Sequence, residues 1–317
     1  MPEVNWPEQP VTVRVPATSA NLGPGFDSLG LALSLYDHVQ ARATTGGVEV
    51  QVTGQGADEV GRGEQHLVIR AMRAAFAAMG AQPAGIALSC RNEVPQGFGL
   101  GSSAAAIVAG LIAARALAAG CDQNGHTGRS DPLSDDALLA LACQLEGHPD
   151  NVAACLRGGL TIAWGSARGA QVARLEPSPD LVPVLCVPAQ PLATETARKA
   201  LPAQIPHSDA AANSARAALL IAALTGRPDL LFAGTRDFLH QDYRAGAMPE
   251  TADLTVQLRM AEIAAVVSGA GPAVLSLTVA GGTPGLDEIT RIAEQANIAW
   301  QVLPLTIDHE GARILPG

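Results

Sequence analysis

One stretch of the sequence, PQGFGLGSSAAAIVAGLIAAR from Pro95 to Arg115, constrains the fold more than any other. Gly97, Gly99 and Gly101 stand at alternate positions in it. Because glycine has no Cβ, such a backbone can adopt positive φ angles and approach a ligand closely. The alanine-rich run that follows has high helix propensity, so we expect the glycines to lead into a helix N-terminus. Free amide groups and the positive end of the helix dipole would face the loop, which suits a phosphate group.

This loop differs from the Walker A phosphate loop, which ends in Gly-Lys-Ser or Gly-Lys-Thr. Lys199 is the only lysine in the chain, so no lysine at this loop can reach the outer phosphates or act as a general base. A glycine turn followed by Ser102 and Ser103 is also common as plain architecture. Taken alone, the segment therefore leaves phosphate binding and a purely structural turn as equal alternatives.

The composition is that of a globular protein, because 48% of the 317 residues are hydrophobic and only 16% are charged. The formal net charge of −10 argues against a surface that binds nucleic acid or an anionic membrane. The five cysteines form no CxxC pair, so we interpret them as buried apolar side chains in a reducing compartment. The N-terminus lacks the features of a signal peptide, and the apolar run Ala104–Ala114 is too short to span a bilayer. We expect a soluble cytoplasmic protein.

Hydrophobic periodicity and turn residues predict a mixture of strands and helices. Strands are expected at 11–15, where Pro16 ends the strand, and at 37–43, 48–53, 86–90, 158–164, 181–187, 263–267, 273–279 and 299–305. Helices are expected at 66–79, 102–119, 135–146, 151–156, 194–201, 210–224, 230–241 and 287–295. A polar connection is expected at 121–133.

A loop rich in glycine and hydroxyl side chains, expected at Ala17–Gly30, carries the amide Asn21 and the carboxylate Asp27. Loops of this kind often carry binding groups. The alternative is that each side chain bonds its own backbone, which is the commoner role of an isolated Asx residue.

A second polar cluster, Glu146-Gly-His-Pro-Asp-Asn151, follows a predicted helix. A helix stop and the cap of the next helix would explain its glycine, its proline and Asp150. Glu146 and His148 are not needed for capping, so we assign them to function.

Arg198 and Arg244 are candidates for a clamp on an anionic substrate. Individually, each would most often be a solvated surface charge. In a chain this acidic they form a candidate pair for a carboxylate, because guanidinium groups bind carboxylates through two hydrogen bonds. Thr194 precedes Arg198 by four residues and lies on the same face of the predicted helix.

Three segments in fixed order carry a resemblance to a known family: VRVPATSANLGPGFDSLGLAL at Val13–Leu33, VPQGFGLGSSAAAIVAG at Val94–Gly110 and VVSGAGPAVLSL at Val266–Leu277. Together they resemble the signature motifs of the GHMP kinases, and the resemblance spans nearly the whole chain. The full first motif and the segment Glu146–Val152 are most similar to the branch that phosphorylates homoserine. The resemblance implies transfer of the ATP γ-phosphoryl group to the side-chain hydroxyl of L-homoserine, giving O-phospho-L-homoserine for threonine biosynthesis.

The resemblance also implies an α+β fold with the two domains of GHMP kinases. Residues 1–168 would form an ATP-binding domain like ribosomal protein S5 domain 2, and residues 169–317 a ferredoxin-like domain. The implied ligands are ATP, Mg²⁺ and L-homoserine, with no nucleic acid or membrane partner. A homodimer is left open as an alternative to a monomer.

Motif positions imply roles for individual residues. The nucleotide would be bound by Pro95, Gln96, Gly97, Phe98, Gly99, Leu100, Gly101, Ser102, Ser103, Ala104 and His66. Mg²⁺, which prefers oxygen ligands, would be bound by Ser102 or Ser103 together with Glu146. The substrate would be bound by Asn21, Asp27, His148, Thr194, Arg198, Arg244 and Gly269, with Asp27 facing its ammonium group and the arginines its carboxylate. Glu146, Asn151 and Ser103 would be catalytic, and Asn151 and His148 would orient the reacting hydroxyl.

The sequence departs from its relatives in two respects. Mevalonate-kinase-like members use a lysine–aspartate pair near the hydroxyl, and this lysine is missing here, so the resemblance favours catalysis by positioning and charge stabilisation. Related sequences usually carry asparagine near the adenine where this chain has His66, which leaves nucleotide preference open. Two alternatives remain: a GHMP kinase for another small alcohol, and a non-catalytic nucleotide-binding relative.

Overall fold

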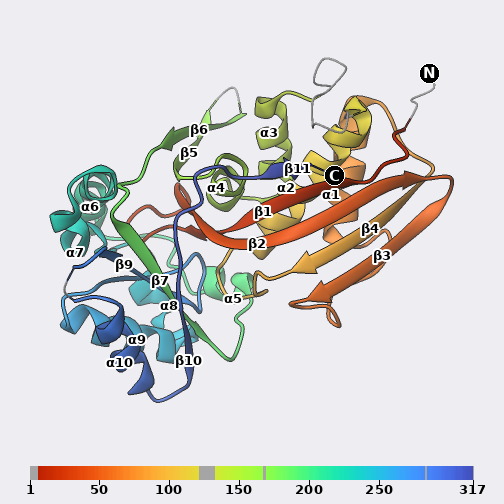
Figure 1. Cartoon of the computed structure of the whole chain (residues 1–317). Helices are drawn as coiled ribbons and strands as arrows, with labels where there is room; N and C mark the ends of the chain where they lie inside the picture. Colours follow the sequence, from red (N-terminus) through yellow and green to blue (C-terminus); the bar gives the residue numbers. More distant parts are fainter. Residues whose placement is uncertain (1–5, 121–132, 167–168, 283, 317) are drawn as a thin grey trace.

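The computed structural model describes residues 6–120, 133–166, 169–282 and 284–316, and Figure 1 shows their arrangement. The strands are β1 (Val11–Ala20), β2 (Leu29–Thr44), β3 (Gly47–Gly54), β4 (Gly85–Asn92), β5 (Leu160–Ser166), β6 (Gly169–Leu175), β7 (Leu181–Pro188), β8 (Ala264–Val267), β9 (Val274–Val279), β10 (Trp300–Pro304) and β11 (Arg313–Leu315). The helices are α1 (Leu67–Met79), α2 (Ser102–Ala119), α3 (Asp135–Glu146), α4 (Asp150–Arg157), α5 (Thr194–Lys199), α6 (His207–Thr225), α7 (Leu231–Gly234), α8 (Gln241–Arg244), α9 (Pro249–Met260) and α10 (Leu286–Glu294), with 3-10 turns at Pro228–Leu230 and Ala245–Ala247. The polar connection expected at 121–133, which includes Cys121, lies outside the described residues except for Leu133.

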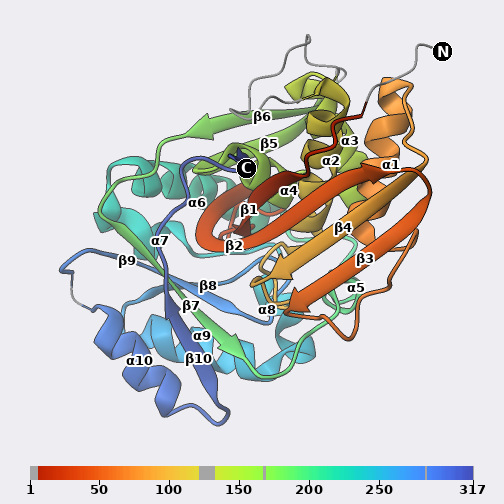
Figure 2. The same cartoon turned by 45° about the vertical axis from the view of Figure 1, so that its right-hand side comes forward.

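The larger sheet is built mainly from the N-terminal half of the chain. Its strands lie in the order β11-β1-β2-β4-β3, with β5 beside β2 and β6 beside β5. β3 and β4 are parallel and connected through α1, whereas the other neighbouring strands are antiparallel. Helices α1–α4 cover one face of this sheet, as Figures 1 and 2 show.

The first two strands are longer than predicted. The prediction that Pro16 ends β1 is wrong, because the strand continues to Ala20 with a shift of register against β2 between Pro16 and Ala17. Proline has no amide hydrogen and is tolerated in sheets at such irregularities. β2 is likewise one continuous strand from Leu29, so the loop between the two strands shrinks to residues 21–28.

The smaller sheet has the strand order β10-β7-β9-β8, and all its neighbouring strands are antiparallel. Along the chain, helices separate β7 from β8, β9 follows β8 directly, and α10 separates β9 from β10. This β-α-β-β-α-β connectivity is that of a ferredoxin-like domain. α9 and α10 pack against this sheet through a cluster that includes Leu254, Leu258, Ile289 and Ile292. The expected α+β class with two domains is confirmed.

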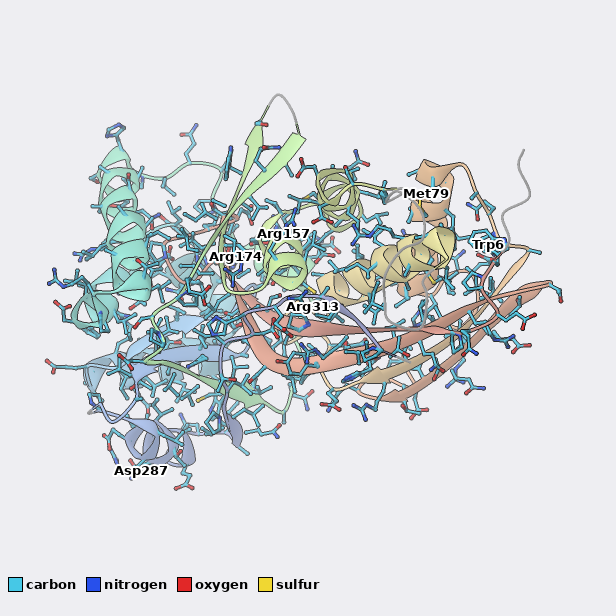
Figure 3. All side chains as sticks on the ribbon, turned by 45° about the horizontal axis from the view of Figure 1, so that its top comes forward. Trp6, Met79, Arg157, Arg174, Asp287 and Arg313 are labelled. Carbon is cyan, nitrogen blue, oxygen red and sulfur yellow. The ribbon has the colours of Figure 1, made fainter. Side chains whose placement is uncertain are left out.

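The boundary expected at residue 168 does not coincide with the division between the two sheets. β6 follows that position but pairs with β5 along its whole length, and Arg174 of β6 donates a hydrogen bond to the Arg157 carbonyl of α4 at 3.1 Å (Figure 3). β11, near the C-terminus, pairs with β1. Residues 169–175 and 313–315 therefore belong to the larger sheet, and the sequence predicted neither strand.

One hydrophobic cluster joins the two sheets. It contains Leu31 and Leu33 of β2 together with Leu185 of β7 and Leu275 of β9. A second cluster lies between the larger sheet and its helices and includes most of α2. By length and composition α2 could cross a membrane, since it extends beyond the apolar run Ala104–Ala114, but most of it is buried inside the protein, as in a core helix.

The cysteines that the structure describes are Cys90, Cys143, Cys155 and Cys186, and all four are free. Burial raises the pKa of the Cys90 and Cys186 thiols to about 12. Both therefore remain protonated and act as apolar side chains, as the sequence predicted.

The prediction of one helix at 230–241 is wrong. The chain instead forms α7, a turn and α8, and the Asp237 carboxylate accepts hydrogen bonds from the amides of Leu239, His240 and Gln241. A side chain that takes up backbone donors in this way competes with a continuous helix. The break places Arg244 at the end of α8, where it turns inward.

Candidate active site

The glycine loop leads into the N-terminus of α2, as predicted. Gly97, Gly99 and Gly101 have φ angles of 80°, 74° and 69°. A Cβ on Gly99 would collide with the Ser268 carbonyl oxygen, and one on Gly101 with the Thr18 hydroxyl. The close approach of Ser268 and Thr18 therefore requires glycine at positions 99 and 101.

Ser268 and Thr18 connect the loop to the other two motif segments. The Ser268 hydroxyl lies 2.8 Å from the Gly99 carbonyl oxygen and 2.9 Å from the Ser19 hydroxyl. The Thr18 amide donates to the Leu100 carbonyl oxygen at 3.0 Å. The three motif segments thus meet around one loop, although they are far apart in the sequence.

A cavity of about 220 Å³ opens at the N-terminus of α2. It is lined by Asn21, Asp27, Gly99, Leu100, Gly101, Ser102, Ser103, Glu146, His148, Asp150, Asn151, Thr194, Arg198, Arg244, Gly269 and Ala270. Every residue expected to bind the substrate, the metal or the reacting hydroxyl is in this set. The cavity draws its polar side chains from the N-terminal motifs, from the α3–α4 turn and from the second half of the chain.

Ser103 and Glu146 form the pair of oxygen ligands that was expected for a metal. The Ser103 hydroxyl donates to Glu146 Oε1 at 2.5 Å, so the end of α3 is joined to the start of α2. In the described part of the chain, no group of three or more His, Cys, Asp or Glu side chains could hold a metal ion. One carboxylate and one hydroxyl nevertheless fit Mg²⁺ that is shared with phosphates, because Mg²⁺ usually takes few protein ligands and completes its shell with phosphate and water.

The loop at residues 21–28 presents Asn21 and Asp27 in left-handed backbone conformations, with φ angles of 68° and 51°. The Asn21 side chain donates to the Gly269 carbonyl oxygen at 2.7 Å and accepts from the Asp27 amide at 2.9 Å. Asn21 therefore braces the loop against the turn at Gly269. The Asp27 carboxylate is left to face the cavity.

Asp27 pairs with Arg198 of α5, whose Nη2 lies 3.2 Å from Asp27 Oδ1. Both side chains are partly exposed. The carboxylate and the guanidinium that were expected to bind the two ends of an amino acid therefore lie beside each other.

Arg244 is the most unusual basic residue of the site because it is only 2% exposed. Its guanidinium donates to the carbonyl oxygens of Ala197 and Gly269, each at 3.2 Å, and to His240 Nδ1 at 3.1 Å. His240 Nε2 lies 2.8 Å from the Gly23 carbonyl oxygen, which can only accept, so the imidazole is neutral with its proton on Nε2. Burial lowers the pKa of both His240 and Arg244.

The α3–α4 turn positions an imidazole and an amide. The buried Asp150 carboxylate accepts hydrogen bonds from His148 Nδ1 at 2.9 Å and from the backbone amide of Asn151 at 2.8 Å. The hydrogen bond from His148 raises the pKa of its imidazole. Asn151 Oδ1 accepts from the Thr18 hydroxyl at 2.7 Å. Asp150 begins α4 and was predicted only to cap it.

A second cavity, of about 260 Å³, shares Ser102 and Ser103 with the first. It is lined by Asp37, Val39, Val60, Gly61, Gln65, His66, Leu67, Val68, Cys90, Asn92, Gln96, Ser102, Ser103, Ala105 and Ala106. His66 is 6% exposed, its Nδ1 has no partner among the described residues, and burial lowers the pKa of the imidazole. The two cavities meet at the serines that begin α2.

Four residues that were assigned to the nucleotide line neither cavity: Pro95, Gly97, Phe98 and Ala104. Phe98 packs against the cluster between the sheets, and Ala104 is fully buried. The Gly97 carbonyl oxygen accepts from the Leu192 amide at 2.9 Å. These residues support the loop from outside the cavities.

Sequence reasoning missed several residues that hold the site together. Thr18, Asp37 and His240 act through contacts with residues far away in the sequence, so no local pattern could have revealed them. Asp237 acts on the backbone amides two to four residues further along the chain. Asp150 stood within a recognised cluster but was taken as a cap. A carboxylate so close to His148 and Asn151 in the sequence was the available signal.

Comparisons with known proteins identify the family that the three motif segments resemble. Residues 66–159 match the GHMP kinases N terminal domain. The chain is 50% identical over 306 residues to a homoserine kinase of Streptomyces coelicolor, covering 96% of this chain and 94% of that protein. It is 47% identical over 268 residues to a homoserine kinase of Mycobacterium tuberculosis, covering 83% of each. The crystal structure of homoserine kinase from Cytophaga hutchinsonii superposes with a TM-score of 0.81 at 26% identity, covering 96% of this chain and 97% of that one.

Proposed function

Because this chain belongs to the homoserine kinases of the GHMP kinase family, we propose that its two joined cavities bind L-homoserine and ATP for phosphoryl transfer between them. The observation that carries this proposal is that Ser102 and Ser103 line both cavities at the N-terminus of α2. The nucleoside would occupy the cavity beside His66. The amino acid would occupy the cavity beside Asp27 and Arg244.

The phosphates would be bound by the amides of the glycine loop and by the dipole of α2. Glu146 and Ser103 would hold Mg²⁺ at this point, and the ion when bound would supply neutralisation of the phosphate charge. The short hydrogen bond between these two side chains keeps their oxygens together at the cavity wall.

Homoserine recognition would use charges of both signs. Asp27 would bind the ammonium group, and Arg198 and Arg244 the carboxylate. Arg244 is held by two carbonyl oxygens and His240, so its position is fixed before the substrate binds and little side-chain freedom is lost on binding. Thr194 lies on the same wall.

The reacting hydroxyl would be oriented by Asn151 and His148, which Asp150 holds in place. Lys199, the only lysine in the chain, does not line the cavity. Phosphoryl transfer has a loose transition state that asks mainly for alignment and charge stabilisation. We therefore infer that catalysis proceeds by positioning, without a dedicated strong base.

The proposal is tested by a coupled assay of ADP release with L-homoserine, L-threonine, L-serine and mevalonate. We expect homoserine to be the preferred acceptor, and a preference for mevalonate would instead indicate a kinase for another small alcohol. Turnover with none of the four would favour a non-catalytic nucleotide-binding relative.

We propose a cytoplasmic location, and sedimentation analysis would decide between a monomer and a homodimer.

A further inference from the structure

Asp37 is a buried carboxylate that no step of the proposed reaction uses. It lies on β2 and is 7% exposed. Its Oδ1 accepts hydrogen bonds from the backbone amides of Glu93 and Val94, at 2.7 and 2.9 Å. These two residues leave β4 and lead directly into Pro95 and the glycine loop. Oδ1 therefore fixes the point at which the phosphate loop begins.

The surroundings of Asp37 do not compensate its charge. Among the described residues it forms no ion pair, and the charge of Glu93 raises its pKa further, while its own charge acts on the thiols of Cys90 on β4 and Cys155 on α4. Burial raises the pKa of Asp37 to about 6 even though the two amides oppose this shift. The carboxylate is thus charged near neutral pH in a place that disfavours charge, and buried charges are retained where a ligand or partner uses them.

The second carboxylate oxygen points to such a ligand. In the part of the chain that the structure describes, Oδ2 has no hydrogen-bond partner, and because it is not one of the buried side-chain atoms that lack a partner, it is accessible to solvent. Asp37 lines the second cavity together with His66, Ser102 and Ser103. A residue in the wall of the proposed nucleoside cavity therefore carries an accessible acceptor, Oδ2, that no described protein group uses.

We propose that Asp37 determines nucleotide recognition: Oδ1 fixes the start of the phosphate loop while Oδ2 accepts a hydrogen bond from a donor on the nucleoside. This inference rests on the proposed assignment of the second cavity to the nucleotide. The donor is either the exocyclic amino group of the base or a ribose hydroxyl. One carboxylate would then join the placement of the phosphates to that of the nucleoside.

The test is Asp37→Asn, because the amide oxygen can still accept from Glu93 and Val94 while an NH₂ group replaces the acceptor that faces the cavity. Binding of a non-hydrolysable ATP analogue is measured by calorimetry at pH 7.5, which requires no turnover. We expect about tenfold weaker binding, as for the loss of a hydrogen bond to a charged group. The KM for homoserine should stay the same, and the melting temperature should not fall. Asp253→Asn, on the exposed face of α9, makes the same change of charge and should bind the analogue normally.

Two further nucleotides distinguish the donors in the wild-type protein. If the base is the donor, ITP, which lacks the amino group, binds about tenfold more weakly than ATP, and Asp37→Asn removes the difference. If the ribose is the donor, 2′-deoxy-ATP shows this behaviour instead. Unchanged affinity of Asp37→Asn for the ATP analogue overturns the inference and leaves the proposed kinase activity standing. Absence of nucleotide binding to the wild-type protein would overturn the proposed function itself.

Discussion

At the scale of single residues, the site is built from charges whose partners fix their positions. Arg244 is bonded to backbone carbonyl oxygens and to a neutral His240, Glu146 is bonded to Ser103, and Asp150 holds two neighbours. Each of these groups is oriented by the protein itself. Such preorganisation is what a reaction controlled by alignment requires.

Glu146→Gln tests the metal assignment at this scale. The amide keeps the size of the side chain and an oxygen toward Ser103 but removes the negative charge that would hold Mg²⁺. We expect kcat to fall by about a hundredfold, as for the loss of one group that stabilises transition-state charge, and the Mg²⁺ concentration for half-maximal activity to rise. Steady-state kinetics over a range of Mg²⁺ concentrations measure both effects. Turnover close to that of the wild type at every Mg²⁺ concentration would contradict the assignment.

Arg198→Leu tests the carboxylate clamp with a side chain that is partly exposed, so that folding is little affected. We expect the KM for homoserine to rise by about tenfold or more through the lost charge-assisted hydrogen bond, while the KM for ATP stays the same. Arg227→Leu is a matched control, because Arg227 is an exposed arginine paired with Asp229 outside both cavities. An equal loss of affinity for both substrates would count against the clamp.

The pKa of Asp37 leads to a prediction about stability. A folded-state value of about 6 lies above the unfolded value of about 3.9, so folding favours the protonated form. The resulting penalty is absent below pH 4, grows as the pH rises to 6 and is fully present above it, at roughly 2–3 kcal/mol. Asp37→Asn should therefore gain stability relative to the wild type as the pH rises from 4 to 7. Thermal unfolding across this range measures the difference in stability between Asp37→Asn and the wild type. A difference that does not change with pH would contradict the raised pKa of Asp37.

At the scale of elements, the glycine loop is held by contacts that leave no room for side chains. Gly99→Ala would combine an unfavourable φ of 74° with a collision against the Ser268 carbonyl oxygen. We expect a loss of stability above the roughly 1–2 kcal/mol of the backbone term alone, together with weaker ATP binding. Gly80→Ala is the matched control, because its φ is 68° and it faces open space. Equal effects of the two variants in chemical denaturation would show that the contact is unimportant.

The elements also show where sequence reasoning succeeds and where it stops. The glycine loop and the helices at 102–119 and 135–146 follow from local chemistry, and the structure confirms them as α2 and α3. β6 is only partly buried and β11 has three residues, so neither has a clear alternating pattern. The break between α7 and α8 depends on where Asp237 places its carboxylate. For the site, motifs identified most of the residues that line the first cavity but few of those that line the second, and Asp37 and His240 depend on contacts that only the folded chain creates.

At the scale of the whole molecule, the two sheets share one hydrophobic cluster, which includes Leu33 and Leu275. The proposed substrate site also takes residues from both halves. We therefore expect a single cooperative unfolding transition in calorimetry, and saturation with an ATP analogue at about 100 times its Kd should add roughly 2.7 kcal/mol. Two separate transitions, of which only one responded to nucleotide, would show that the halves fold independently.

The pairing of β1 with β11 has a consequence for the order of events during synthesis. Residues 313–315 complete the outer edge of the larger sheet beside residues 12–14, so β1 is made long before the strand that covers its edge. Until residues 313–315 have left the ribosome, that edge is open to other chains, and a nascent protein in this state would be a natural client for a chaperone. Deletion of residues 313–315 would leave every proposed catalytic side chain in place and still expose that edge.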